Sequence, residues 1–158
     1  MAEKRLIQDE YAQIMEHIQK TENFLLSGGA GSGKTYTLVQ VIRGLLKEYP
    51  IASIACITYT NAAVDVITER LSQGSFILPS TIHSFAWNAI KQYQSKLIDI
   101  MDNDEALQPR EGDFEKVIEV RYTLGHRYKD NGIQYLYHDD VLKLFCSLLD
   151  NAKFRRIF

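Results

Sequence analysis

The clearest chemical pattern in the chain is a run of eight residues: Gly28, Gly29, Ala30, Gly31, Ser32, Gly33, Lys34 and Thr35. The run satisfies G-x-x-x-x-G-K-[ST], a glycine-rich loop that ends in a lysine and a hydroxyl. Because glycines carry no side chain, the backbone can curl until successive N–H groups point at phosphate oxygens. A helix that begins at this loop attracts the same anion with its amino terminus. The pattern therefore predicts a binding site for a nucleoside triphosphate.

The side chains that end this run have separate expected roles. We expect the Lys34 ammonium to contact the β- and γ-phosphates. The Thr35 hydroxyl is expected to ligate Mg²⁺, which prefers oxygen ligands. Lys34 and Thr35 are therefore the predicted catalytic residues. Tyr36 follows directly and either stacks on the nucleotide or packs against the protein. The pattern alone does not separate a kinase from a GTPase or a motor protein.

Short apolar runs around the loop predict the elements that must hold it. Residues 24–26 form an apolar run that stops at the glycines, which indicates a buried strand leading into the loop. Residues 38–45 repeat apolar side chains at helical spacing and predict the helix that follows. The continuous apolar run at residues 51–57 is typical of a strand covered on both faces, as in a parallel sheet. This alternation of strand and helix favours an α/β fold.

The remaining elements follow from the same kind of spacing. Helical periodicity predicts further helices at residues 7–18, 63–71, 82–97, 114–122 and 141–149. Asp139 is the expected cap of the last helix. A third strand is expected at residues 75–78 and a turn at residues 130–132. Polar and charged residues from 99 to 112 indicate a linker or surface loop.

Bulk properties limit the classes of function. The chain has 158 residues, a charged fraction of 24% and a formal net charge of −2, which fits one globular domain. This charge balance implies that any contact with nucleic acid is local, through loops and a groove. Cys56 and Cys146 form no CxxC pair, and Cys56, which lies inside an apolar run, is expected to be a reduced core thiol. No apolar run reaches the roughly 18 residues of a membrane helix, so we expect a soluble cytoplasmic protein with no membrane partner.

Two short segments that follow the glycine loop in the sequence indicate which class of nucleotide-binding protein the chain resembles. Thr58-Tyr59-Thr60-Asn61-Ala62-Ala63 resembles motif Ia of the UvrD/Rep helicases, and Thr81-Ile82-His83-Ser84-Phe85 resembles motif Ib of the same superfamily 1 group. The order and the spacing of the segments behind the loop also match this family. Residues 138–158 resemble the helix and basic turn that precede the acidic Walker B strand. The resemblance is good over residues 22–95, weaker over residues 138–158 and absent between them.

The resemblance implies a P-loop NTPase of the RecA-like fold, with a three-layer parallel sheet, that binds ATP and Mg²⁺. It also implies that single-stranded DNA is contacted by Tyr59, Thr60, Asn61, Thr81, His83 and Ser84. Tyr59 would stack on a base, and the short polar side chains would reach phosphate oxygens. The alternatives are a core position for Tyr59 and a structural role in the loop for His83. In this family a glutamine ahead of the P-loop reads adenine, and Gln8 is our candidate, with Gln13 second; a solvated surface glutamine is the alternative.

The resemblance also implies a division of the chain. We expect a partial RecA-like ATP-binding domain at residues 1–96, a linker or loop at 97–112, and a helical segment at 113–158 that leads toward the Walker B strand. Residues 135–140 resemble Walker B only superficially, because no clean apolar strand precedes the acidic pair. The sheet is therefore expected to be incomplete, with the Walker B strand absent. An open edge beside residues 24–27 would then favour self-association.

These inferences predict an ATP-binding fragment of an ATP-dependent DNA helicase, inactive in hydrolysis by itself. A RecD-like superfamily 1 helicase is one alternative, because that branch also places Thr-Ile-His-Ser after a P-loop. A non-motor nucleotide-binding regulatory module is another, because such a protein needs no Walker B strand. A small P-loop kinase would share the glycine loop but offers no account of residues 58–61 and 81–84.

Overall fold

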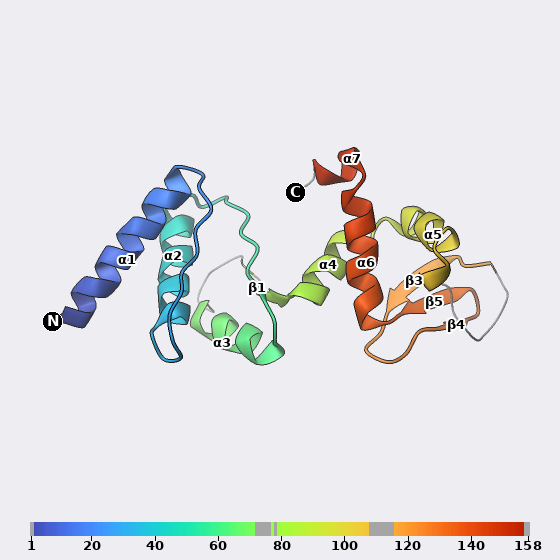
Figure 1. Ribbon diagram of the computed structural model, residues 1–158, viewed down its shortest axis with the longest axis horizontal. Helices are drawn as coiled ribbons and strands as arrows, with labels where there is room; N and C mark the ends of the chain where they lie inside the picture. Colours follow the sequence, from blue (N-terminus) through green and yellow to red (C-terminus); the bar gives the residue numbers. More distant parts are fainter. Residues whose placement is uncertain (1, 72–76, 78, 108–115, 157–158) are drawn as a thin grey trace. The chain divides into compact units, whose positions relative to one another are not determined.

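The computed structural model describes residues 2–71, 77, 79–107 and 116–156, with side chains from Glu10 onward. These residues form a mixed α/β chain of helices and two small sheets. By their internal contacts they divide into two compact units, Met1–Ser80 and Thr81–Phe158. Figure 1 labels most of the elements within each unit. The expected division at residues 97 and 113 stays a prediction.

The first unit begins with two helices packed side by side, α1 (Ala2–Gln19) and α2 (Lys34–Glu48) (Figure 1). The apolar spacing at residues 7–18 and 38–45 predicts both helices, and the structure confirms them. Gly44 allows their close approach, because a Cβ atom there would collide with the Tyr11 hydroxyl. The core between the two helices is formed by Ile14, Met15 and Val41.

The third helix of this unit, α3 (Asn61–Leu71), packs against α2 and confirms the helix predicted at residues 63–71. The short strand β1 (Ile57–Thr58) precedes α3 and pairs with β2 (Ser80–Thr81). The Ser80 N–H donates to the Cys56 carbonyl at 3.0 Å. A second apolar cluster joins these elements and consists of Val39, Ile42, Cys56, Ile67, Leu71 and Ile77.

Two strands predicted in the first unit differ from the structure. Residues 24–26 are not a strand, and Leu25 is 90% exposed. A strand needs hydrogen-bonded neighbours, and in the described part of the chain this segment is paired with none. The strand predicted at residues 51–57 is reduced to β1, because only its end meets β2; Ile51 is 97% exposed. Of the strand predicted at residues 75–78, all but Ile77 lie outside the described residues.

The second unit combines helices with a three-stranded sheet (Figure 1). Its helices are α4 (Ile82–Ile90), α5 (Gln94–Asp102), the 3-10 turn η1 (Glu105–Leu107), α6 (His138–Leu149) and α7 (Ala152–Arg155). Its strands are β3 (Glu119–Tyr122), β4 (Tyr128–Asp130) and β5 (Ile133–Leu136). Its core is formed by Ala86, Ile90, Leu97, Met101, Leu107, Val120, Leu136, Val141, Leu144, Leu148 and Phe154.

The sheet has the order β3-β5-β4, with β3 parallel and β4 antiparallel to β5. The predicted turn at residues 130–132 is confirmed as the connection from β4 to β5. Asn131 and Gly132 adopt φ angles of 48° and 75°, which suits the tight turns that join antiparallel strands. The helix predicted at residues 114–122 is wrong, since β3 occupies its second half. There Val120 is buried and Arg121 exposed, an alternation typical of strands.

The single helix predicted at residues 82–97 is also wrong, because α4 ends at Ile90 and α5 begins at Gln94. The Gln94 side chain explains the break. Its Oε1 accepts from the Val120 N–H at 2.7 Å, and its Nε2 donates to the Val120 carbonyl at 3.2 Å. These bonds fasten α5 to the edge strand β3. In the region predicted as a linker, α5 continues to Asp102 and Leu107 is buried; residues 108–112 lie outside the described residues.

The helix predicted at residues 141–149 is confirmed as α6, but Asp139 is not its cap. Tyr137 holds the cap position. The Asp140 carboxylate, one residue beyond the expected cap, accepts from the Tyr137 N–H at 3.0 Å. Among the described helices of either unit, none has the length and apolar character needed to cross a membrane.

Candidate functional site

The glycine loop and the start of α2 hold the predicted phosphate-binding residues in one place. Gly31 and Gly33 have φ angles of 77° and 84°, a region that favours glycine. Around Gly29, Gly31 and Gly33, an added Cβ atom would meet no other atom within 4 Å. At Gly28 the same atom would lie 2.5 Å from the Ser32 hydroxyl. The loop therefore has free space beside Gly29, Gly31 and Gly33, whereas Gly28 lies in close contact with Ser32.

The Lys34 side chain folds back over this loop. Its ammonium donates to the Gly28 carbonyl at 2.6 Å, to the Gly29 carbonyl at 2.6 Å and to the Ser32 hydroxyl at 3.2 Å. A fourth contact inside the loop, from the Ser32 N–H to the Gly29 carbonyl, measures 3.3 Å. The lysine that the sequence assigns to the phosphates is thus held by oxygen atoms of the loop itself. Its present partners are neutral oxygens, for which phosphate oxygens are stronger substitutes.

Helix α2 presents its amino terminus to the loop. No acidic residue lies in its first turn, and its cap residue Gly33 offers no side-chain hydrogen bond. The partial positive charge of the helix terminus is therefore not balanced locally. Thr35 is half-buried on the first turn, and Tyr36 is exposed. Ala30 and Ser32 are exposed within the loop. This donor set, an ammonium, a hydroxyl and backbone N–H groups, fits a nucleotide phosphate with its Mg²⁺.

The predicted adenine-reading glutamine is not tested by the structure. Gln8 lies in α1, among the residues whose side chains are outside the described part. Gln13, the second candidate, is exposed on the same helix.

The segment of residues 58–61 forms the turn into α3. The Thr58 hydroxyl donates to the Thr60 carbonyl at 3.1 Å, and the Thr60 hydroxyl accepts from the Ala63 N–H at 3.2 Å. Thr60 therefore caps α3. Between them Tyr59 is 93% exposed, so the core position considered for this ring is wrong within the described unit. Asn61 is exposed at the start of the helix.

The segment of residues 81–84 belongs to the second unit and begins α4. The Thr81 hydroxyl accepts from the Ser84 N–H at 3.2 Å and donates to the Ser84 hydroxyl at 3.0 Å. Thr81 is thus the cap of α4, and Ser84 keeps its own hydroxyl proton for another partner. His83 is half-buried, with its ring stacked on His138 at a centroid distance of 3.3 Å. Burial lowers the pKa of His83, the nearby His138 lowers it further, and Asp139 opposes both.

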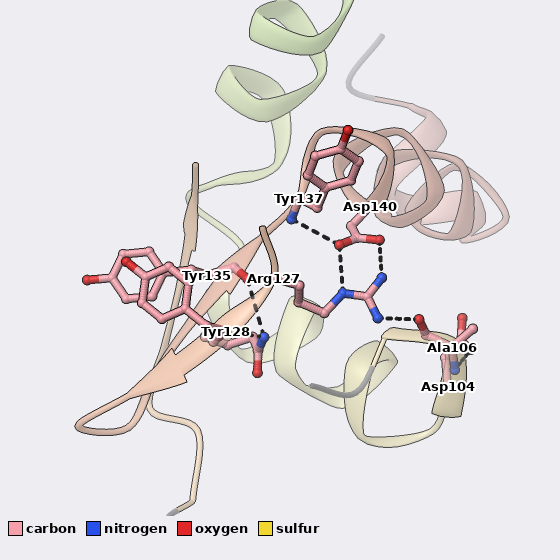
Figure 2. A network of polar contacts seen from close by, with 8 residues as sticks. Asp104, Ala106, Arg127, Tyr128, Tyr135, Tyr137 and Asp140 are labelled. Carbon is pink, nitrogen blue, oxygen red and sulfur yellow. Dashed lines mark hydrogen bonds and ion pairs between the residues drawn. The ribbon is translucent and has the colours of Figure 1, made fainter. Parts of the chain in front are cut away.

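The acidic residues considered as Walker B have a different role in the structure. The strand β5 does precede them, but it contains the buried Gln134 and so is not a clean apolar strand, in agreement with the expectation. Asp140, however, is buried and held by Arg127 (Figure 2). Arg127 Nε donates to Asp140 at 2.9 Å, and its two terminal nitrogens donate to Asp140 and to the Ala106 carbonyl. The carboxylate is therefore engaged in an ion pair rather than open to a metal.

The Arg127–Asp140 ion pair and the contact between His83 and His138 could not be predicted from the sequence. The partners lie 13 and 55 residues apart, and no local spacing signals either pair. The position of Asp140 after an apolar segment is the one feature of the sequence that points to a special role for a member of these pairs. In the part of the chain that the structure describes, no group of three metal-ligating side chains is found.

Comparison with known proteins gives this arrangement a context. The chain is 39% identical over 93 residues to the Gabija protein GajB of Bacillus cereus, a match that covers 55% of this chain and 14% of GajB. It is 28% identical over 159 residues to RecB of the RecBCD enzyme of Borreliella burgdorferi, covering 85% of this chain and 13% of RecB. It is 35% identical over 136 residues to an ATP-dependent helicase/nuclease of Ruminiclostridium cellulolyticum, covering 67% of this chain and 11% of that protein.

The chain thus spans between 11% and 14% of the length of these three relatives. No solved structure matches it. The family description "UvrD/REP helicase N-terminal domain" matches residues 7–156, which include the glycine loop and both segments that resemble motifs Ia and Ib. The chain therefore belongs to the UvrD/REP helicase N-terminal domain family.

Proposed function

We propose that the chain forms the ATP-binding part of the first motor domain of a DNA helicase that moves along single-stranded DNA. The single observation that carries the proposal is the position of the Lys34 ammonium, within hydrogen-bonding distance of three oxygens of the glycine loop. When ATP binds, Lys34 exchanges these neutral oxygens for the β- and γ-phosphates. The Thr35 hydroxyl ligates the Mg²⁺ that accompanies the nucleotide. Tyr36 and Gln8 are proposed to face the base.

We further propose a RecA-like three-layer sheet for the first unit in the whole protein. Its support is the strand β1 at Ile57–Thr58 and the packing of Ile54 and Cys56 in the same apolar cluster as Val39. The exposed apolar side chain of Leu25 is proposed to belong to a surface through which two copies of the chain associate.

Contacts to single-stranded DNA are proposed for two turns, the one that begins α3 in the first unit and the one that begins α4 in the second unit. Tyr59 offers an exposed ring for base stacking. Thr60, Asn61, Thr81 and Ser84 supply short polar groups for phosphate oxygens. His83 is proposed to contribute by holding its turn in place. ATP binding would change the affinity for DNA, because it would shift the protein between conformations that bind DNA with different affinities.

Titration with a fluorescent ATP analogue and Mg²⁺ tests the nucleotide half of the proposal. We expect wild-type protein to bind, with negligible hydrolysis, and Lys34→Ala to bind at least about tenfold more weakly, since a charge-assisted contact contributes roughly 1.5–3 kcal/mol. Lys47→Ala, at the other end of α2, is the matched control and should bind like wild type. Equal affinity of wild type and Lys34→Ala would refute the nucleotide site.

Fluorescence anisotropy with a labelled single-stranded oligonucleotide tests the DNA half. Tyr59→Ala should weaken binding by about fivefold or more, because stacking on a base contributes roughly 1–3 kcal/mol. Tyr49→Ala removes another exposed tyrosine of the same unit and should leave the affinity unchanged. If both variants bind as wild type does, Tyr59 is not part of a DNA site.

A further inference from the structure

Three aromatic side chains of the second unit form a connected set, which we call the aromatic triad: Tyr122, His138 and His83. The Tyr122 hydroxyl, at the end of β3, lies 2.6 Å from Nδ1 of His138. The His138 ring, at the start of α6, stacks on the His83 ring with a centroid distance of 3.3 Å and an interplanar angle of 22°. Through these contacts β3 and α6 reach the first turn of α4.

The contacts of His83 show why its ring depends on the triad. Its Nε2 atom is buried and has no hydrogen-bond partner among the described residues. A buried polar atom without a partner is costly, and it provides no hydrogen bond that fixes the orientation of the ring. The stacking contact with His138 therefore holds the ring in place. His138 in turn is oriented by the Tyr122 hydroxyl, which we assign as the donor to Nδ1.

The first turn of α4 links this ring to the groups proposed to contact DNA. His83 lies between Thr81 and Ser84, whose hydroxyls are joined at 3.0 Å. The Ser84 N–H donates to Thr81 at 3.2 Å and closes the turn around His83. A displacement of the His83 ring would therefore move the turn that carries both hydroxyls. Catalytic and binding groups need support of this kind to stay within about 0.5 Å of their working positions.

We propose that Tyr122 and His138 are positioning residues for residues 81–84, and that they set the affinity of this turn for the phosphates of single-stranded nucleic acid. The proposal rests on the function proposed above. The proposal assigns a role to Tyr122 in β3 and to His138 in α6. The sequence alone predicts no function for either residue. Neither Tyr122 nor His138 is expected to touch the nucleic acid.

The pKa of His83 provides a readout that a purely structural role of the triad would not change. The titratable groups that face His83 are His138 and Asp139 from α6, with Tyr122 of β3 behind His138. Burial raises the pKa of Tyr122, so its hydroxyl remains a donor. Burial and the neighbouring His138 lower the pKa of His83. Replacing His138 by phenylalanine keeps an aromatic ring but removes the second imidazole, so the pKa of His83 should rise toward its ordinary value.

Four variants test the proposal by oligonucleotide anisotropy at pH 7.5. His138→Ala removes the stacking ring, and Tyr122→Phe removes the hydroxyl that orients it. We expect His138→Ala to weaken binding by about fivefold, since a ring contact contributes roughly 1 kcal/mol. Tyr122→Phe, which leaves the ring stack in place, should weaken binding less, by about twofold. The matched controls are His126→Ala and Tyr128→Phe, whose ring centroids lie 5.5 Å apart in the same unit but outside the triad. Both controls should bind as wild type does.

Rescue by His138→Phe separates positioning from general stability. This variant should recover most of the affinity that His138→Ala loses, and NMR titration of the His83 ring should show the higher pKa. Circular dichroism establishes that each variant is folded at the temperature of the assay. Wild-type affinity in folded His138→Ala and Tyr122→Phe would overturn the inference alone. Absence of oligonucleotide binding by the wild type would instead overturn the proposed function, and the inference with it.

Discussion

Single residues of the glycine loop have positions that follow directly from their chemistry. Gly31 and Gly33 have positive φ angles, which a residue with a side chain adopts at a cost of roughly 1–2 kcal/mol. Lys34 turns back onto loop carbonyls because an ammonium seeks oxygen partners. The positive φ angles agree with the run of glycines in the sequence, whereas the contacts of Lys34 with the loop carbonyls were not predicted.

The predicted roles of other single residues depend on distant partners, and here the sequence is a poorer guide. Tyr59 could have packed in a core, yet it is exposed. For His83 the alternative that it supports its turn agrees with the observed stacking on His138. No spacing in the sequence brings residues 83 and 138 together, because only the packing of α4 on α6 does so.

The lowered pKa of His83 has a consequence for stability against pH. The unfolded chain protonates this ring near its ordinary pKa of 6.5, whereas the folded chain does so only at lower pH. The unfolded state therefore binds more protons between these two values, and stability falls as pH drops through that window. We expect His83→Phe, which keeps an aromatic ring, to lose less stability than wild type between pH 7 and pH 5.

Thermal unfolding at several pH values measures this difference. The quantity to compare is the change in melting temperature with pH, since the carboxylates common to both proteins contribute equally to it. A steeper decline in His83→Phe than in wild type would contradict the assignment of a neutral, half-buried ring.

Elements of secondary structure were predictable where periodicity extends over several turns. The helices α1, α2, α3 and α6 follow from apolar spacing, and the turn between β4 and β5 follows from Asn131 and Gly132. The strand β3 was missed because four residues carry too little alternation to outweigh a helical interpretation. The break between α4 and α5 depends on the Gln94 side chain and its bonds to Val120, a contact between elements that no local pattern reveals.

The Arg127–Asp140 ion pair connects η1, the segment before β4 and the start of α6 (Figure 2). The Asp140 side chain is 2% exposed and that of Arg127 is 22% exposed. Arg127→Met leaves a buried carboxylate with the Tyr137 N–H as its main remaining partner. Removal of one member of a buried pair costs about 3 kcal/mol or more, so we expect a loss of stability of that order.

Urea unfolding followed by circular dichroism gives the free energy of unfolding for this comparison. Arg121→Met is the matched control, because Arg121 pairs with Glu119 on the surface of the same unit; its effect should be much smaller. Equal losses of unfolding free energy in the two variants would mean that the buried pair stabilises the second unit no more than the surface pair does.

For the chain in its entirety, the sequence predicts the α/β class and the family, while the extended sheet is a proposal. The described strands form a two-stranded and a three-stranded sheet. Leu25 and Ile51, in the two segments predicted as strands, are exposed. A strand needs hydrogen-bonded neighbours that can lie far away in the sequence, and a local apolar run does not reveal whether such neighbours exist.

We propose that backbone N–H groups of residues 28–35 bind a triphosphate. Two-dimensional ¹H–¹⁵N NMR of the whole chain, titrated with Mg-ATP, observes these groups directly and reports on both units at once. We predict saturable shifts centred on the amides of residues 29–35 and smaller changes elsewhere in the first unit. Shifts confined to the second unit, or none at millimolar Mg-ATP, would contradict the claim.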